Sequence, residues 1–372
     1  MSLSSGRKVG VGIIGCGKIS DQYFIGCKRY DVLEIVACAD LDQPRARVKA
    51  REHGVSRAVS TAELLADPDI EIVVNLTIPA VHSEVNEAIL AAGKHVYVEK
   101  PLALDSASSA RVVEFAGRAD RLLACAPDTF MGGGIQSARG LLDAGAIGEP
   151  VAAMAFMLSH GPESWHPAPE FYYLRGGGPM FDMGPYYLTA LVNFFGPMAR
   201  ISGTARKSFP ERLITSQPLA GKKAKVEVPT HYAGTIDFAN GAVATIVTSF
   251  DVWPGPAFPN ITLFGSEGTM VVPDPNHFTG NILLRSAGAT DLQSVPLTHQ
   301  AERGRGTGVA DLAYSILRRG RPVRANGELA HHVVEAMEAF DRASASGEYV
   351  TLASSCERPP ALPDLPANVL DA

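Results

Sequence analysis

The sequence predicts an α/β chain that begins with a doubly wound parallel sheet and continues into an α+β domain with a large, mostly antiparallel sheet. Between residues 8 and 127, continuous apolar runs alternate with helical patterns, as they do where helices cover both faces of a parallel sheet. After residue 144 the apolar residues recur with period two, which indicates antiparallel strands with one solvated face. An Asn-Gly dipeptide at 240–241 lies between two such strands and predicts a type I′ hairpin turn.

The expected elements follow in order along the chain. The first domain has apolar runs of strand length, and the segments between them have helical periodicity. The second domain carries a long hairpin at 230–253 and a further strand pair at 266–276. The first-domain strands are expected at 9–15, 34–40, 70–77, 94–100 and 122–126. Helices are expected at 62–69 and 82–95 in that domain, and at 308–320 and 328–347 late in the chain.

Composition and charge exclude several classes of protein. The chain has 372 residues, 46% hydrophobic and 19% charged, which suits a globular protein of about two domains. The net charge of -6, without a long run of lysine or arginine, argues against nucleic-acid and membrane partners. The five cysteines include no Cys-x-x-Cys pair and give no disulfide framework. We therefore expect a cytoplasmic protein whose partner is a small molecule or another copy of the chain.

A glycine-rich turn follows the first strand. Gly15-x-Gly17-x-x-Ser20 lies where glycines let the backbone approach a pyrophosphate at a helix N-terminus. Serine stands where glycine or alanine is usual, and it still permits close helix packing. The motif predicts a Rossmann dinucleotide site, and Lys18 and Ile19 of the same turn are expected to contact the cofactor.

Asp40 ends the second strand, at the position where a carboxylate can accept hydrogen bonds from an adenosine ribose. Because a carboxylate there repels a 2′-phosphate, the pattern favours NAD over NADP. Arg45 and Arg47 nearby leave NADP open. The alternative is an aspartate that only caps a turn at the strand end.

Two later strand ends also carry polar side chains. Thr77, Pro79 and His82 form a rigid turn that could lie along the cofactor, although His82 could equally be a helix-start residue satisfied by backbone groups. Glu99 and Lys100 close another buried strand just before a proline. Lys100 is thereby presented at the carboxyl edge of the sheet, where ligands bind in such folds.

With these motifs the chain resembles the Gfo/Idh/MocA family of sugar and polyol oxidoreductases. The resemblance rests on "GCGKIS", "TIPAVH", "EKP" and "GGGPMFDMGPYY", in that order, and extends from residue 8 to about residue 360. It implies that Lys100 is the catalytic lysine, that Gly15, Gly17 and Asp40 contact the dinucleotide together with Glu99, and that the chain forms homodimers or homotetramers.

The second motif departs from the family pattern, which commonly reads Asp-x-Gly-x-His-x-x-Asp. Here Asp182 is present, but Tyr186 stands at the histidine position and Thr189 at the final aspartate. Branches that resemble glucose-fructose oxidoreductase and dihydrodiol dehydrogenase also carry tyrosine there. If Asp182 caps a helix that ends near residue 195, Tyr186 shares a polar face with Asp182, Thr189 and Asn193.

Tyr187 belongs to the neighbouring apolar stripe of the same expected helix, and the ordinary place of such a stripe is the core. Tyr186 is therefore expected to face the site. The alternative for Tyr186 is a half-buried tyrosine whose hydroxyl is hydrogen-bonded within the protein.

The expected chemistry requires a base beside a carbinol hydroxyl, because hydride transfer to nicotinamide releases that proton. Burial and the positive charge of oxidised nicotinamide would both favour the neutral form of Lys100, which could then accept the proton. Tyr186 could polarise the same oxygen or relay the proton, and Asp182 could orient either group.

The segment "SHGPESWHPAPEFYYLRGGG" is expected to recognise the substrate. Aromatic faces beside hydrogen-bonding groups suit a polyhydroxylated ring, whereas loop packing is the alternative for each residue and is favoured for Trp165. The two histidines have no accompanying carboxylate and cysteine cluster, so no metal is expected. The expected substrate contacts are His160, Trp165, His166, Arg175, Asp128 and Thr189.

The sequence thus predicts an NAD(P)-dependent dehydrogenase or reductase that acts on a CH-OH group of a sugar, sugar derivative or polyol. Residues 1–7 are expected to be a disordered leader, 8–127 the dinucleotide-binding domain, and 128–372 the domain for substrate binding and for oligomerisation through its sheet. One alternative is concealed-redox glycoside cleavage or elimination, without net NADH formation. Another is a regulator that binds the dinucleotide without catalysis, against which the retention of Lys100 argues.

Overall fold

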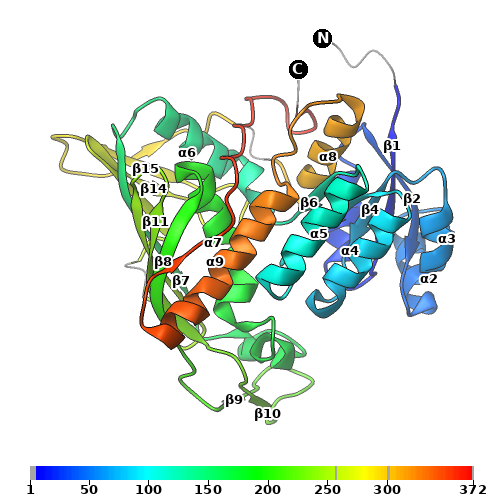
Figure 1. Cartoon of the computed structure of the whole chain (residues 1–372), viewed down its shortest axis with the longest axis horizontal. Coiled ribbons are helices and arrows are strands. Elements are labelled where there is room, and N and C mark those ends of the chain that lie inside the picture. Colours follow the sequence, from blue (N-terminus) through cyan, green and yellow to red (C-terminus); the bar gives the residue numbers. More distant parts are fainter. Residues whose placement is uncertain (1–5, 256–257, 300–301, 371–372) are drawn as a thin grey trace. The chain divides into compact units, whose positions relative to one another are not determined.

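The computed structural model of the chain describes residues 6–255, 258–299 and 302–370 (Figure 1). The chain folds into two compact units. The first unit comprises Met1–Gln136, Thr298–His331 and Pro359–Ala372, and the second comprises Ser137–Leu297 and His332–Arg358. Residues 1–5 of the expected leader lie outside the described residues, and Arg7 at its end pairs with Glu71 at 2.6 Å.

The first unit is built on a six-stranded sheet in the order β3-β2-β1-β4-β5-β6, in which every pair is parallel. This is the doubly wound arrangement that the alternation of apolar runs and helical segments predicts. The strands are β1 (Val9–Ile14), β2 (Leu33–Ala39), β3 (Arg57–Ala58), β4 (Ile72–Asn75), β5 (His95–Val98) and β6 (Leu123–Cys125). The helices between them are α1 (Ser20–Cys27), α2 (Gln43–Glu52), α3 (Thr61–Ala66), α4 (His82–Ala91) and α5 (Ser106–Arg118).

Local signals explain where these helices begin. Asp42 caps α2 by accepting a hydrogen bond from the Arg45 backbone N–H, and a proline follows in the first turn. Ser60 and Glu63 form a capping box at the start of α3. All six residues of β1 are buried, as expected for the central strand of a sheet covered on both faces.

Two C-terminal segments, Thr298–His331 and Pro359–Ala372, belong to the first unit. The division of the chain into two units therefore differs from the single domain boundary expected between residues 127 and 128. Helix α8 (Thr307–Leu317) packs against α1 and β6. Gly26 of α1 has no room for a side chain, because a Cβ there would lie 1.5 Å from the Arg305 carbonyl oxygen. The apolar side chains of Leu362 and Leu370 are 2% and 0% exposed within the core of this unit.

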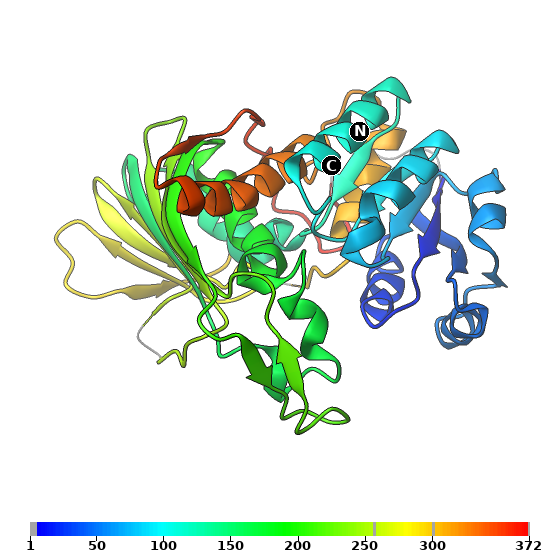
Figure 2. The ribbon, with the colours of Figure 1, turned by 60° about the horizontal axis from the view of Figure 1, so that its bottom comes forward.

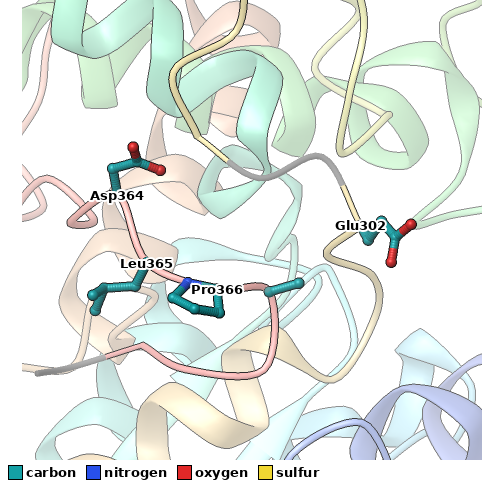
Figure 3. A pocket seen from close by; sticks show the side chains of 5 residues that line it. Glu302, Asp364, Leu365 and Pro366 are labelled. Atoms are coloured by element: carbon teal, nitrogen blue, oxygen red, sulfur yellow. The ribbon is translucent and has the colours of Figure 1, made fainter.

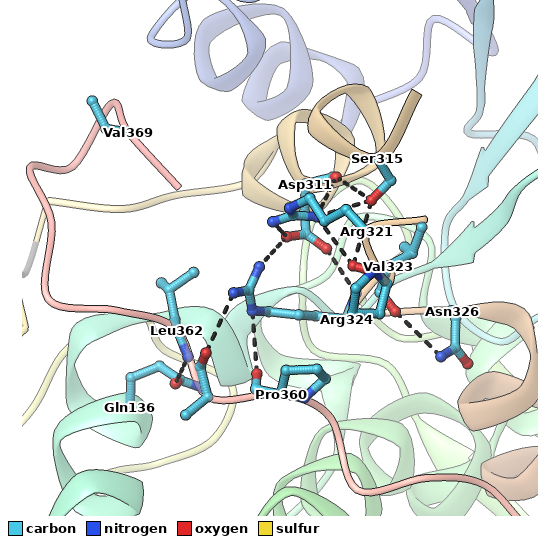
Figure 4. A network of polar contacts seen from close by, with 12 residues as sticks. Gln136, Asp311, Ser315, Arg321, Val323, Arg324, Asn326, Pro360, Leu362 and Val369 are labelled. Atoms are coloured by element: carbon cyan, nitrogen blue, oxygen red, sulfur yellow. Dashed lines mark hydrogen bonds and ion pairs between the residues drawn. The ribbon is translucent and has the colours of Figure 1, made fainter. Parts of the chain in front are cut away.

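Polar contacts from Arg324 and Gln136 hold residues 360–362 against this unit (Figure 4). Arg324 donates to the carbonyl oxygens of Pro360 and Ala361, and pairs with buried Asp311 at 2.6 Å. The Leu362 backbone N–H donates to Gln136 Oε1 at 2.7 Å. The terminal segment therefore satisfies its backbone groups with side chains instead of a sheet.

The second unit is built on a nine-stranded sheet in the order β16-β15-β14-β13-β7-β12-β11-β8-β17. All the neighbouring pairs are antiparallel except β7 with β12. The strands are β7 (Pro150–Leu158), β8 (Met198–Arg206), β11 (His231–Phe238), β12 (Val243–Ser249), β13 (Ile261–Gly265), β14 (Gly268–Val272), β15 (Ile282–Ser286), β16 (Gln293–Val295) and β17 (Val350–Thr351). A separate two-stranded ribbon pairs β9 (Glu211–Leu213) with β10 (Lys223–Lys225). The helices are α6 (Gly133–Asp143), α7 (Gly178–Phe195) and α9 (Gly327–Ser346). The first residues of α6 and α9 belong to the first unit.

Among the described residues, helices cover one face of this large sheet and leave side chains on the other face exposed. Helix α7 contacts β7, β11 and β12 (Figure 2). Phe340 of α9 lies against glycines of β8 and β11. Side chains toward these helices are buried, such as Ile246 at 1% exposed. On the opposite face Met154 and Val243 are each 46% exposed. The period-two pattern of the sequence corresponds to this difference.

The hairpin between β11 and β12 is present, but the predicted type I′ turn is wrong. That turn needs positive φ at both central residues, whereas Asp120 is the non-glycine residue with positive φ among those described. Gly241, at φ +92°, is instead the last residue of a turn closed by its N–H bond to the Phe238 carbonyl at 3.0 Å. Asn240 stabilises this longer turn because its Oδ1 accepts the Ala242 N–H at 3.0 Å.

Among the described residues, no helix has both the length and the apolar character that crossing a membrane requires.

Candidate functional site

The glycine turn has the geometry of a dinucleotide loop. Gly15 has a φ of +95°, and a Cβ there would lie 2.6 Å from the Leu76 carbonyl oxygen. Around the Cβ position of Gly17 there is open space within 4 Å. Ser20 begins α1, and its hydroxyl donates to the Gly17 carbonyl at 2.6 Å. Serine at the third motif position therefore closes the turn and leaves the side of Gly17 accessible to a phosphate group.

Asp40 directly follows β2, and its carboxylate is fixed by backbone groups. Its Oδ2 accepts the Cys16 N–H at 2.7 Å, and its Oδ1 accepts the Asp42 N–H at 2.8 Å. Arg45 Nη1 lies 3.6 Å from Asp40 Oδ2, and the aspartate side chain is 10% exposed. A carboxylate has about four acceptor positions, so the two backbone bonds leave capacity for ribose hydroxyls. Asp40 therefore caps the turn at the end of β2 and can still contact a cofactor, so the two roles that the sequence leaves open are compatible.

His82 is an internal brace in this structure and not an exposed cofactor contact. The imidazole is 1% exposed, with Nδ1 2.7 Å from the Pro101 carbonyl oxygen and Nε2 3.0 Å from that of Thr77. Burial lowers the pKa of His82. Thr77 Oγ1 donates to Asn75 Oδ1 at 2.7 Å, and Pro79 opens a short 3-10 turn. The ring thus connects the segment after β4 to the segment after β5.

Glu99 and Lys100 directly follow β5. The Glu99 carboxylate, in a residue that is 8% exposed, accepts the Tyr23 hydroxyl at 2.7 Å through Oε1 and the Lys100 N–H at 2.9 Å through Oε2. Lys100 is half-buried, and the peptide bond to Pro101 is cis. Glu99 was expected as a cofactor contact, but its carboxylate bonds to α1 and to the backbone of Lys100.

Asp128 has a structural position in place of the expected substrate contact. It is 0% exposed, and its Oδ2 accepts the N–H groups of Gly306 and Gly308 at 3.1 and 3.0 Å. Burial raises the pKa of this carboxyl. Asp128 therefore satisfies backbone donors at the start of α8, where the helix dipole also favours a carboxylate.

Helix α7 starts earlier than expected, and Asp182 does not cap it. The helix begins at Gly178 after Gly177, which places Asp182 inside the second turn. Pro179 fits the first turn because its missing N–H would have no partner there. Gly178 has a φ of +76°, and a Cβ there would lie 2.7 Å from the Pro229 carbonyl oxygen. Gly178 thus allows the helix start to approach a segment about 50 residues away in the sequence.

The two adjacent tyrosines are both buried, at 5% exposed for Tyr186 and 1% for Tyr187. The Tyr187 hydroxyl accepts a hydrogen bond from Asn260 at 2.7 Å, and burial raises the pKa of Tyr187. On the face expected to be polar, Thr189 is 3% exposed, and Asn193 accepts bonds from Arg139. Thr189 and Asn193 on that face are therefore buried within the protein, whereas the side chain of Asp182 is half-buried.

The expected substrate segment contains two short 3-10 turns and a cluster of aromatic rings. Trp165 is 61% exposed and meets His166 edge-on with ring centroids 5.5 Å apart. The His160 ring stacks on Trp253 at 3.8 Å. Arg175 is exposed near the start of α7. The turns are Pro162–Ser164 and Pro169–Tyr173.

A buried ion-pair cluster holds this segment in place, and the sequence did not indicate it. Arg212 of β9 pairs with Glu163 at 2.5 Å and with Asp251 at 2.7 Å. Its Nη2 donates to the His160 carbonyl at 2.6 Å, and the Tyr173 hydroxyl donates to Glu163 at 2.5 Å. The partners are far apart in the sequence, so no local pattern could have identified them.

The structure brings the predicted residues together in two groups, one in each unit. The first unit holds the glycine turn, Asp40, Thr77, His82, Glu99 and Lys100 at the carboxyl ends of its parallel strands. The second holds Asp182, Tyr186 and Thr189 on α7, together with the aromatic segment.

Other concave or acidic features lie apart from these residues. A cavity of about 430 Å³ in the first unit is lined by Glu302 and Asp364–Ala367 (Figure 3). Asp21, Glu52 and His53 have the spacing of metal ligands. The Lys49 ammonium, however, lies 2.7 Å from Asp21 and 2.9 Å from Glu52. That single ammonium already pairs with both carboxylates, so the cluster gives no argument for a metal.

Comparison with known proteins identifies the class of protein that this fold and these motifs define. The model of an oxidoreductase family with an NAD-binding Rossmann fold matches residues 9–126, and the model of the GFO/IDH/MocA C-terminal domain matches residues 135–271. An uncharacterized oxidoreductase of Rhizobium meliloti is 30% identical over 270 residues, which cover 71% of this chain and 74% of that protein. The chain belongs to the Gfo/Idh/MocA oxidoreductase family.

Two further proteins are similar over part or all of the chain. The 1,5-anhydro-D-fructose reductase of Ensifer adhaerens is 31% identical over 177 residues, 46% of this chain and 52% of the reductase. The chain therefore spans about half the length of that relative. The structure of a levoglucosan dehydrogenase in complex with NADH and levoglucosan has a TM-score of 0.80 at 19% identity, covering 94% of this chain and 100% of the dehydrogenase. This likeness is one of fold.

Proposed function

We propose that the protein is an NAD(P)-dependent oxidoreductase that transfers hydride between nicotinamide and a carbinol or carbonyl carbon of a sugar, sugar derivative or polyol. The observation that carries the proposal is the position of Lys100, which follows β5 in the same parallel sheet whose first strand leads into the Gly15–Gly17 turn. Ligands bind at this edge of open α/β sheets. The names of the anhydrofructose reductase and of the levoglucosan dehydrogenase support carbohydrate as the substrate class.

The first unit fits a bound dinucleotide. Gly17 has open space where a pyrophosphate would approach, and Asp40 keeps acceptor capacity for the ribose. A bound nicotinamide would supply the hydride acceptor or donor. Lys18 and Ile19 follow the same turn, and Thr77 and Pro79 follow β4. NAD is the proposed cofactor, with NADP as the alternative.

Lys100 and Tyr186 are the proposed proton-transfer groups, and Asp182 would orient one of them. In the oxidative direction the neutral Lys100 amine would accept the hydroxyl proton, and in the reductive direction its ammonium would return it. The Tyr186 hydroxyl would donate a hydrogen bond to the same oxygen. The aromatic segment with His160, Trp165, His166 and Arg175, together with Thr189, would bind the remaining hydroxyls.

The test is absorbance at 340 nm with NAD or NADP across a panel of sugars, polyols and glycosides, with Lys100→Met alongside. We expect reduction of one cofactor by the wild type and its loss in the variant. Retained turnover in Lys100→Met together with lost turnover in Tyr186→Phe would reverse the assigned roles. Glycoside cleavage without net NADH would indicate concealed-redox chemistry, and cofactor binding without any turnover would indicate a regulator.

We also propose that the chain forms a homodimer or homotetramer through the uncovered face of its large sheet. That face exposes apolar side chains, including Met154 and Val243 at 46% each. A second copy would bury them in a closed, symmetric contact. Light scattering of the purified protein tests this proposal directly.

A further inference from the structure

We propose that Tyr23 is a positioning residue for Lys100, acting through the carboxylate of Glu99. The inference rests on the proposed function of Lys100, and it adds a residue that lies in helix α1 and not at a strand end. The Tyr23 hydroxyl donates to Glu99 Oε1 at 2.7 Å, and Glu99 Oε2 accepts the Lys100 N–H at 2.9 Å. One carboxylate therefore connects the helix to the backbone of the lysine.

This connection is rigid because both partners are buried. Tyr23 is 0% exposed and Glu99 is 8% exposed. The Tyr23 ring packs against the Tyr97 ring, with centroids 5.9 Å apart. The Glu99 backbone N–H donates to the Asn75 carbonyl at 2.9 Å. A hydrogen bond is electrostatically stronger in such buried surroundings than in water, so the two bonds hold the carboxyl group of Glu99 in one orientation.

The same helix directly follows the glycine turn. Ser20 begins α1, one turn before Tyr23, and its N–H and hydroxyl both bond to the Gly17 carbonyl, at 3.1 and 2.6 Å. The backbone of α1 therefore links the Ser20–Gly17 bonds to the bond of Tyr23 with Glu99, which in turn bonds to the Lys100 N–H. We infer that this path fixes the lysine relative to the turn that would hold the dinucleotide.

Loss of the Tyr23 hydroxyl would act on orientation and not on charge. Without that donor, Glu99 Oε1 has to find another partner, and rotation of the carboxylate would also disturb its bond to the Lys100 N–H. A misplacement of about 1 Å can reduce a rate by about 100-fold. Because the glycine turn itself is unchanged, binding of the dinucleotide should be much less affected than the chemical step.

The test compares Tyr23→Phe with Tyr30→Phe. Tyr30 is 1% exposed and bonds to Thr307 at 2.7 Å, so its variant also removes a buried tyrosine hydroxyl in the same unit, but one that bonds to Thr307 and not to Glu99. We expect kcat to fall about 10- to 100-fold in Tyr23→Phe, with the dissociation constant for NAD within about threefold of wild type. Tyr30→Phe should keep the wild-type kcat. Equal kcat in the two variants would overturn the proposal.

A double-mutant cycle tests whether Tyr23 acts through Glu99. If it does, Tyr23→Phe should cost no further activity in a Glu99→Ala background. Additive losses would show that Tyr23 acts by another route and would overturn the proposal.

A readout without turnover separates this proposal from the proposed function. Reductive ¹³C-methylation gives Lys100 an NMR signal, which Lys100→Met identifies by its absence. That signal should shift in Tyr23→Phe and stay unchanged in Tyr30→Phe. If the wild type reduces neither cofactor with any sugar, the proposed function fails, and the NMR comparison still decides whether Tyr23 positions Lys100. An unchanged signal in Tyr23→Phe would overturn the positioning role.

Discussion

Replacing Arg212 by methionine tests whether the buried ion-pair cluster holds the expected substrate segment. The arginine side chain is 5% exposed, and its carboxylate partners on Glu163 and Asp251 are 8% and 3% exposed. In the variant, Glu163 would still accept the Tyr173 hydroxyl and Asp251 that of Thr230, but both carboxylates would lose their buried cation. Removing one partner of a buried ion pair costs about 3–5 kcal/mol of the free energy of unfolding.

The structure supplies a matched control and a selective probe. Arg200 pairs with Asp237 on the large sheet, but the arginine is 52% exposed, so Arg200→Met should cost less than about 1 kcal/mol. The chain has two tryptophans, Trp165 and Trp253, and both lie in segments next to the Arg212 cluster. Tryptophan fluorescence therefore follows unfolding of this part of the second unit.

In urea, a loss of about 4 kcal/mol corresponds to a midpoint lowered by about 1–2 M, because the slope for a protein of this size is about 2–3 kcal/mol per molar. Arg212→Met should show that shift in the fluorescence transition, and Arg200→Met should remain close to wild type. Equal midpoints for the two variants would refute the claim that the buried cluster anchors the segment. If the proposed function holds, KM for the sugar should also rise in Arg212→Met, because the segment would be less ordered.

Three further outcomes follow from single contacts. Asp40→Ser should raise the relative affinity for NADP over NAD at least about tenfold in fluorescence titrations, because it removes the negative charge beside Arg45; unchanged preference would contradict the assignment. Burial lowers the pKa of His95 to about 4, and its Nδ1 accepts the Leu122 N–H. Since the imidazole of the unfolded chain binds a proton near pH 6.5, the free energy of unfolding should fall as pH drops from 6.5 to 4, by at most about 1.4 kcal/mol per pH unit. His95→Asn should flatten this pH dependence in urea titrations. An identical slope in the variant would count against this role of His95. Met154→Lys should dissociate the proposed oligomer in light scattering, whereas an unchanged mass would exclude this face as the interface.

The sequence can indicate those parts of the candidate site whose backbone geometry is local. Gly15 must be glycine because of its own φ and its close approach to the segment after β4, and a strand–turn–helix pattern indicates such a position. Lys100 at a strand end is likewise visible from the apolar run before it. The order of parallel strands then brings their carboxyl ends to one edge, so Asp40 and Lys100 fall in the same unit without any long-range contact being known.

The structure differs from the sequence-based expectation where a side chain's surroundings depend on a partner far away in the chain. Asp128 looked like a site residue because it follows β6, but its Oδ2 accepts the backbone N–H groups of Gly306 and Gly308. The same contact explains why the expected domain boundary at 128 differs from the structure, since it ties α8 to the first unit. The sequence near residue 128 does not indicate that Asp128 bonds to a helix start almost 180 residues later.

Tyr23 shows the same limit from the opposite side. In the sequence it is one aromatic residue shortly after the glycine turn, with no motif of its own, and in the structure it is fully buried. Only the three-dimensional contact shows that its hydroxyl bonds to the carboxylate beside Lys100. A buried tyrosine needs a hydrogen-bond partner, and here that partner belongs to the strand end with the proposed catalytic lysine. The requirement that stabilises the core of the first unit would therefore also orient its chemistry, which is why Tyr23→Phe should separate rate from cofactor binding.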